Sequence, residues 1–134
     1  MITQTKAPHV GDLHFENKLW LNELNFAADE LKIFEGYLEE LVRRGGGRNM
    51  MAQVEQYQNQ FIREKEVIDM MKHDINRHEH KLVEFTRRHP VTFDLYEMED
   101  HDGIREAMER FRKIFNELKA NFFLFHQNWR TSQA

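Results

Sequence analysis

The sequence predicts an all-α protein: an antiparallel three-helix bundle whose long helices run up, down and up with coiled-coil-like packing. Three long segments each carry apolar residues in alternating steps of three and four, which places these residues on one stripe of an α-helix. The two prolines, Pro8 and Pro90, bracket a long stretch that contains no further proline. No segment has the strict alternation of a β-strand. Each stripe must be buried against a partner, so three stripes in one chain favour a bundle.

The first helix is predicted from about residue 12 to residue 44. Asp12 is a suitable N-cap, and Arg43 and Arg44 precede three consecutive glycines, which is a typical helix end. Its apolar stripe consists of Trp20, Leu24, Ala27, Leu31, Phe34, Leu38 and Leu41.

The second helix is predicted from about residue 49 to residue 89. Asn49 can cap its start, and Pro90 disfavours helical backbone in the residue before it, so His89 should be its last residue. Its stripe consists of Val54, Tyr57, Phe61, Ile68, Met71, Ile75, Leu82 and Phe85.

The third helix is predicted to start between residues 94 and 103 and to end at about residue 129. Asp94 and Glu97 have the spacing of a capping box, whereas Asp100 and Asp102 offer later starts, so the start stays open. Its stripe consists of Ile104, Met108, Phe111, Phe115, Leu118, Phe122, Phe125 and Trp129.

The chain of 134 residues fits one domain, residues 1–134. Because the glycine turn is short, facing residues of the first two helices should have numbers that add up to about 93. The corresponding value for the second and third helices is about 190. This register would place Ala27 and Ala28 beside Glu64, with His126 at the same level.

Composition excludes several classes of partner. The net charge is -4, with 19 basic and 23 acidic residues interspersed, so we expect no nucleic-acid partner. The stretch from Met1 to Val10 resembles neither a signal peptide nor a membrane span, so we expect no membrane association. The chain has no cysteine, which fits a reducing compartment, and we expect a cytoplasmic protein.

Two stripe positions of the second helix are polar, Glu64 and His78. A buried, unpaired charge is costly, so one interpretation is a metal- or small-ligand site, formed by Glu64 and His126 with Glu23 or Glu30. The other candidate ligand set is His14, His78 and His73. The simpler interpretation is that polar stripe residues fix the helix register or point to solvent.

No catalytic constellation is present. The sole serine is Ser132, outside any nucleophile elbow, and the glycine run lacks the Lys-Ser/Thr of a phosphate loop. We therefore predict that the protein is not an enzyme and that it needs no cofactor.

A second apolar stripe on the first helix remains to be explained. Leu19, Phe26 and Ile33 recur every seven residues, and Tyr37 continues the band. On the third helix, Phe123 and Leu124 should face away from the buried stripe and lie level with Phe26. One interpretation is a thick aromatic core. The other is a homodimer interface, and it makes a non-catalytic helical interaction or scaffold module the leading functional prediction.

Overall fold

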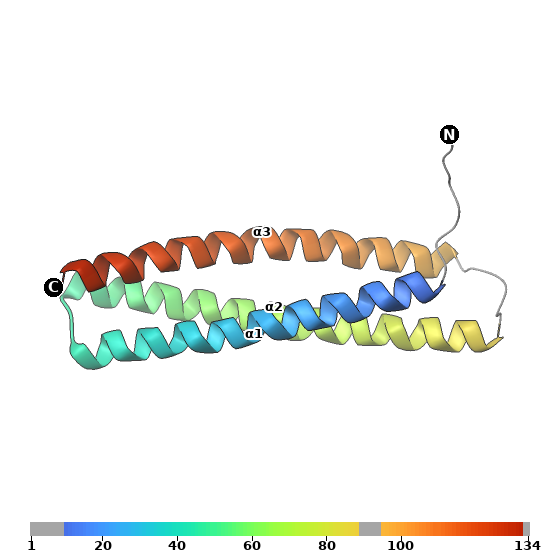
Figure 1. Cartoon of the computed structure of the whole chain (residues 1–134), viewed down its shortest axis with the longest axis horizontal. Helices are drawn as coiled ribbons and strands as arrows, with labels where there is room; N and C mark the ends of the chain where they lie inside the picture. The colour runs from blue at the N-terminus through green and yellow to red at the C-terminus, as the bar shows by residue number, and fades with distance from the viewer. Residues whose placement is uncertain (1–9, 89–94, 133–134) are drawn as a thin grey trace, which may run out of the picture.

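Three long α-helices make up the fold (Figure 1). The computed structural model describes residues 10–88 and 95–132, and these contain helix α1 (Val10–Arg44), helix α2 (Arg48–Arg88) and helix α3 (Leu95–Ser132), with no β-strand. The prediction of an all-α three-helix fold is therefore confirmed. His89, the predicted end of the second helix, and Asp94, the earliest predicted start of the third, lie outside the described residues.

The turn between α1 and α2 has a backbone geometry that favours glycine. Gly45 has a φ of 76°, which glycine adopts without steric cost, and its N–H donates to the carbonyl of Val42 (3.2 Å). The carbonyl of Gly47 accepts from the N–H of Met51 (3.0 Å), so Gly47 is the N-cap of α2. The predicted cap, Asn49, is wrong, because α2 already begins at Arg48.

The helix directions follow from the residues in contact. Phe34 on α1 contacts Phe61 on α2, and their numbers add up to 95, close to the expected 93. Figure 1 shows α2 running opposite to both α1 and α3. One end of the bundle contains the start of α1, the end of α2 and the start of α3. We name it the histidine end. The opposite end, with the turn at residues 45–47, is the glycine-turn end.

The register of α3 differs from the predicted one. Phe61 contacts Phe122, and Tyr57 contacts Phe125, so facing residues of α2 and α3 have numbers that add up to 183 and 182 rather than 190. The cause is the early start of α3 at Leu95, seven residues after the end of α2 at Arg88. At 1.5 Å per residue, a change of eight residues moves α3 by about 12 Å along the bundle.

Residues of the three predicted stripes form one continuous apolar core. Aromatic side chains concentrate towards the glycine-turn end, where Phe61 and Phe122 pack edge to face with ring centroids 5.1 Å apart. The largest apolar side chains among the fully buried residues are those of Phe61, Phe122, Leu24, Leu31, Leu38, Leu41, Ile68, Ile75, Leu82 and Met108.

Both polar stripe residues of α2 are buried. Glu64 is 6% exposed and His78 is 4% exposed. Burial raises the pKa of the Glu64 carboxyl above its usual value, and the charge of Arg63 offsets only part of this effect. Glu64 therefore costs the bundle stability at neutral pH, since an ionised carboxylate is poorly solvated there.

Replacement of this carboxyl should stabilise the fold. We expect Glu64→Leu to raise the free energy of unfolding by about 1–3 kcal/mol at pH 7, because an apolar side chain has no desolvation penalty at this position. Urea unfolding followed by circular dichroism measures the difference. Glu66→Leu, at an exposed position of the same helix, is the matched control and should change stability by less than about 0.5 kcal/mol. A loss of stability in Glu64→Leu would show instead that the Glu64 carboxyl makes a net favourable contribution to the fold.

Candidate functional site

The second apolar stripe of α1 is exposed to solvent in the single chain. All six residues predicted for the interface, Leu19, Phe26, Ile33, Tyr37, Phe123 and Leu124, are between 42% and 64% exposed. Phe15, which the sequence pattern did not reveal, is 62% exposed and extends the stripe by one turn. These residues therefore do not fill the core of the single chain.

The exposed residues of α1 form one straight band. At 3.6 residues per turn, Phe15, Leu19, Phe26, Ile33 and Tyr37 fall within about 40° of one another around the helix axis. The band lies about 120° from the buried stripe of the same helix. We name these five residues the outer stripe. It is the apolar surface that α1 presents to solvent.

A ladder of ion pairs lies between the outer stripe and the core. Glu16, Glu23 and Glu30 on α1 pair with residues of α3 at seven-residue intervals. The shortest N···O distances are 2.6 Å for Glu16–Arg105, 2.6 Å for Glu23–Arg112 and 3.2 Å for Glu30–Lys119. In every pair the residue number on α3 exceeds that on α1 by 89, and we call this difference the offset. A constant offset means that α1 and α3 are parallel and in a fixed register.

A fourth rung replaces the ion pair by an aromatic contact. Tyr37 stacks on His126 with ring centroids 4.7 Å apart, again at an offset of 89. Lys119, Phe123 and His126 follow one another in steps of four and three on α3, so they share one face of this helix. Phe123 therefore lies beside the ladder, on the side of α3 that faces α1.

The predicted level of Phe123 is wrong. The offset of 89 sets it opposite position 34 of α1, between Ile33 and Tyr37, and not beside Phe26. The reason is the same displacement of α3 that changes its register with α2. Phe123 thus extends the outer stripe sideways near the glycine-turn end.

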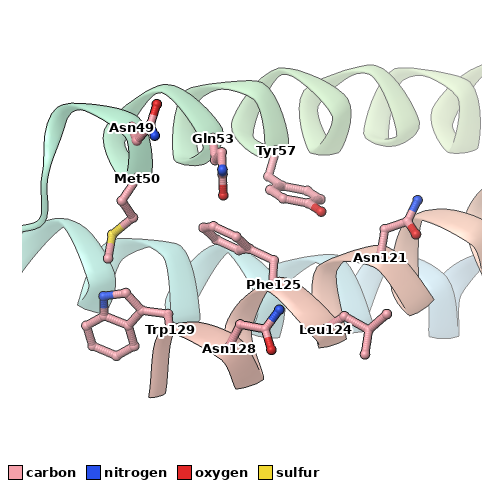
Figure 2. Close-up of a pocket in the computed structure, with 9 residues that line it drawn as sticks. All are labelled: Asn49, Met50, Gln53, Tyr57, Asn121, Leu124, Phe125, Asn128 and Trp129. Atoms are coloured by element: carbon pink, nitrogen blue, oxygen red, sulfur yellow. The ribbon is translucent and has the colours of Figure 1, made fainter. Parts of the chain in front are cut away.

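Leu124 belongs to a different surface. It lines an open groove of about 560 Å³ between the start of α2 and the end of α3 (Figure 2). Tyr57 and Phe125, whose ring centroids are 5.0 Å apart, line this groove together with four carboxamide side chains. The two neighbouring residues Phe123 and Leu124 point about 100° apart on their helix, so they cannot share one flat interface.

A hydrogen-bonded chain of two buried histidines and the partly exposed Glu16 occupies the histidine end, and we name it the buried polar chain. His101 Nε2 lies 2.7 Å from Glu16 Oε1, and His101 Nδ1 lies 3.0 Å from His78 Nε2. A carboxylate only accepts, so a neutral His101 donates from Nε2 and accepts at Nδ1. His78 Nε2 must then be the donor to His101. With His101 in its neutral form, these hydrogen bonds are compatible with a single arrangement of protons.

Further contacts hold this chain in place. The ring of His101, which is 1% exposed, stacks on Trp20 with centroids 4.7 Å apart. Burial would raise the pKa of the Glu16 carboxyl, but hydrogen bonds from Arg105 and His101 outweigh it and hold this pKa below its usual value. Glu16 is thus a stable anion that orients His101.

The sequence pattern did not single out His101 or the buried Asn17. Asn17 donates from Nδ2 to Glu79 Oε1 at 2.9 Å. Both positions continue the predicted stripes upstream: Asn17 lies three residues before Trp20, and His101 lies three residues before Ile104. Extending each stripe by one step would have found them.

The predicted metal ligands do not come together. With numbers of facing residues adding up to about 182, Glu64 and His126 are about eight residues apart in level, or about 12 Å. In the other candidate set, His14 Nδ1 is hydrogen-bonded to the Glu79 carboxylate, and His73 is exposed to solvent. In the part of the chain that the structure describes, no group of three or more His, Cys, Asp or Glu side chains could hold a metal ion.

Comparisons with known proteins add no assignment. No protein-family model matches this chain, and no curated protein and no solved structure shows significant similarity to it. Within residues 10–88 and 95–132, no helix combines the length and the apolarity needed to cross a bilayer. The outer stripe and the buried polar chain are therefore the two candidate functional features of the molecule.

The buried His78 makes stability depend on pH. Burial, and to a smaller extent electrostatic repulsion from His101 and Lys81, lowers the pKa of His78 below its usual 6.5, while the acidic groups of Asp100 and Glu79 act in the opposite direction. Below about pH 6.5 the unfolded chain then binds more protons than the folded one, so the free energy of unfolding should fall as the pH falls. One such group contributes up to about 1.4 kcal/mol per pH unit.

His78→Gln tests this dependence, because the amide still donates a hydrogen bond but does not titrate. We expect the slope of unfolding free energy against pH, measured by urea unfolding from pH 8 to pH 5, to be smaller than in the wild type. His80→Gln, at an exposed position of the same helix, is the control and should leave the slope unchanged. Parallel curves for the wild type and His78→Gln would show that His78 does not carry the effect.

Proposed function

We propose that the protein is a non-catalytic helical interaction module that associates with a second copy of itself through the outer stripe. The observation that carries this proposal is the exposure of five large apolar side chains in one straight band, with Phe123 beside it. Large contiguous apolar patches are uncommon on the surface of monomers and mark interaction sites. A cytoplasmic location is part of the proposal, since the chain has no cysteine.

The size of the patch supports a stable contact between copies. Large side chains expose about 150–250 Å² when free, so six of them at about half exposure offer roughly 600 Å². Two copies would bury about 1,200 Å², which is the lower limit of stable protein interfaces.

The polar groups of the bundle support a role other than catalysis. His101 is almost fully buried and its two ring nitrogens contact Glu16 and His78, so no substrate reaches it. The hydrogen-bonded groups Glu16, His101 and His78 thereby resemble a structural network, in which each group positions its neighbour.

Charged residues in the outer stripe should abolish self-association without unfolding the chain. We expect the wild type to be dimeric and Phe26→Lys/Ile33→Lys to be a folded monomer, because the two-fold symmetry places four charges in one apolar contact. Sedimentation equilibrium gives the mass, and circular dichroism gives the helix content.

The matched control carries the same charges elsewhere. Ile62 and Met70 on α2 are 53% and 63% exposed, so Ile62→Lys/Met70→Lys should remain dimeric. A wild type that stays monomeric at tens of micromolar would refute self-association. Unfolding of Phe26→Lys/Ile33→Lys would instead show that the outer stripe supports the fold of the single chain.

A further inference from the structure

The intervals between successive residues of the outer stripe are the same in both directions along α1. Phe15, Leu19, Phe26, Ile33 and Tyr37 follow one another at intervals of four, seven, seven and four residues. Reflection through Phe26 exchanges Phe15 with Tyr37 and Leu19 with Ile33. The outer stripe is therefore symmetric about its central residue.

Such symmetry matches one arrangement of two copies. In an antiparallel helix pair, residues at the same level have numbers with a constant sum. With a two-fold axis at Phe26, this sum is 52, so Phe26 meets Phe26 of the second copy. Phe15 then meets Tyr37, and Leu19 meets Ile33, each twice. An isologous interface requires this kind of self-complementarity, in which every contact is repeated by the axis.

The polar residues on the same face favour the antiparallel arrangement. Asn22 and Asp29 are exposed and lie between the apolar members of the outer stripe. Their numbers add up to 51, so in the antiparallel pair the Asn22 amide lies within one residue of the level of Asp29 in the second copy and can donate to it. A parallel, in-register pair would place Asp29 against Asp29, and like charges in close contact are unfavourable.

Phe123 adds an independent argument. It lies opposite position 34 of its own α1, near the glycine-turn end. In the antiparallel pair, this level coincides with position 18 of the second copy, between Phe15 and Leu19. Each Phe123 thus covers the half of the outer stripe that has no apolar neighbour on its own α3.

We infer that two copies pair through α1 in antiparallel orientation, with a two-fold axis at Phe26. This inference rests on the proposed self-association and adds its geometry. Each α1 then packs on two sides: its buried stripe faces the core of its own bundle, and its outer stripe faces α1 of the second copy. The pair is a six-helix assembly with both α1 helices at its centre.

Single cysteines introduced into this cysteine-free chain test the geometry. We use Asn22→Cys and Asp29→Cys, which keep every apolar residue of the outer stripe, and Asp69→Cys on the exposed face of α2 as the control. Each variant alone, and a mixture of Asn22→Cys with Asp29→Cys, is oxidised and analysed by non-reducing gel electrophoresis. Circular dichroism confirms that each variant is folded.

Antiparallel pairing predicts that only the mixture forms disulfides rapidly. A disulfide needs Cα atoms within about 7 Å, and Asn22 of one copy lies about eight residues, or about 12 Å, from the level of Asn22 in the other. The mixture should react about a hundredfold faster than Asp69→Cys, because two thiols inside one dimer have a millimolar effective concentration.

The remaining outcomes separate failure of the geometry from failure of the proposed function. Rapid disulfide formation by Asn22→Cys alone and by Asp29→Cys alone would show a parallel pair, which overturns the inference and keeps self-association. A dimer by sedimentation with no rapid disulfide at either position would place the contact on another surface, which also overturns the inference. A monomeric wild type would overturn both proposals.

Discussion

The position of α3 relative to α1 depends on charged side chains that repeat every seven residues. Glu16, Glu23 and Glu30 each reach a basic residue of α3 at the same offset of 89. The pairs are partly exposed, so each contributes little free energy on its own. Their common offset nevertheless determines what lies opposite every residue of α1. It brings His126 against Tyr37 towards the glycine-turn end, whereas His101 contacts Trp20 at an offset of 81.

Local periodicity was enough to predict the helices, the buried stripes and the existence of a second apolar stripe on α1, but it left the exposure of that stripe open. These features depend only on residues within a few turns of one another, as with Leu19, Phe26 and Ile33. The association of two copies through them stays a prediction. The start of α2 differed by one residue, because its N-cap is Gly47 and not Asn49.

The register of α3 could not be predicted in the same way. A pattern with a period of seven repeats itself after every heptad, so offsets that differ by seven residues satisfy the stripes almost equally well. Placing Phe123 level with Phe26 corresponds to an offset of 97, about one heptad from the observed 89. The expected Glu64–His126 site failed for this reason, because its two residues are on helices whose relative position the periodicity leaves open.

The buried pair His78 and His101 has a consequence for conformational uniqueness. If α3 slid by one heptad, two rungs of the ladder would form again, because Glu16 would meet Arg112 and Glu23 would meet Lys119. His101 would then lose both Glu16 and Trp20, and no other histidine follows it by seven residues in α3. The charged ladder is degenerate, whereas the histidine contact is unique. The contact between His78 and His101 therefore specifies one register of α3 and disfavours a bundle in which α3 is displaced by one heptad.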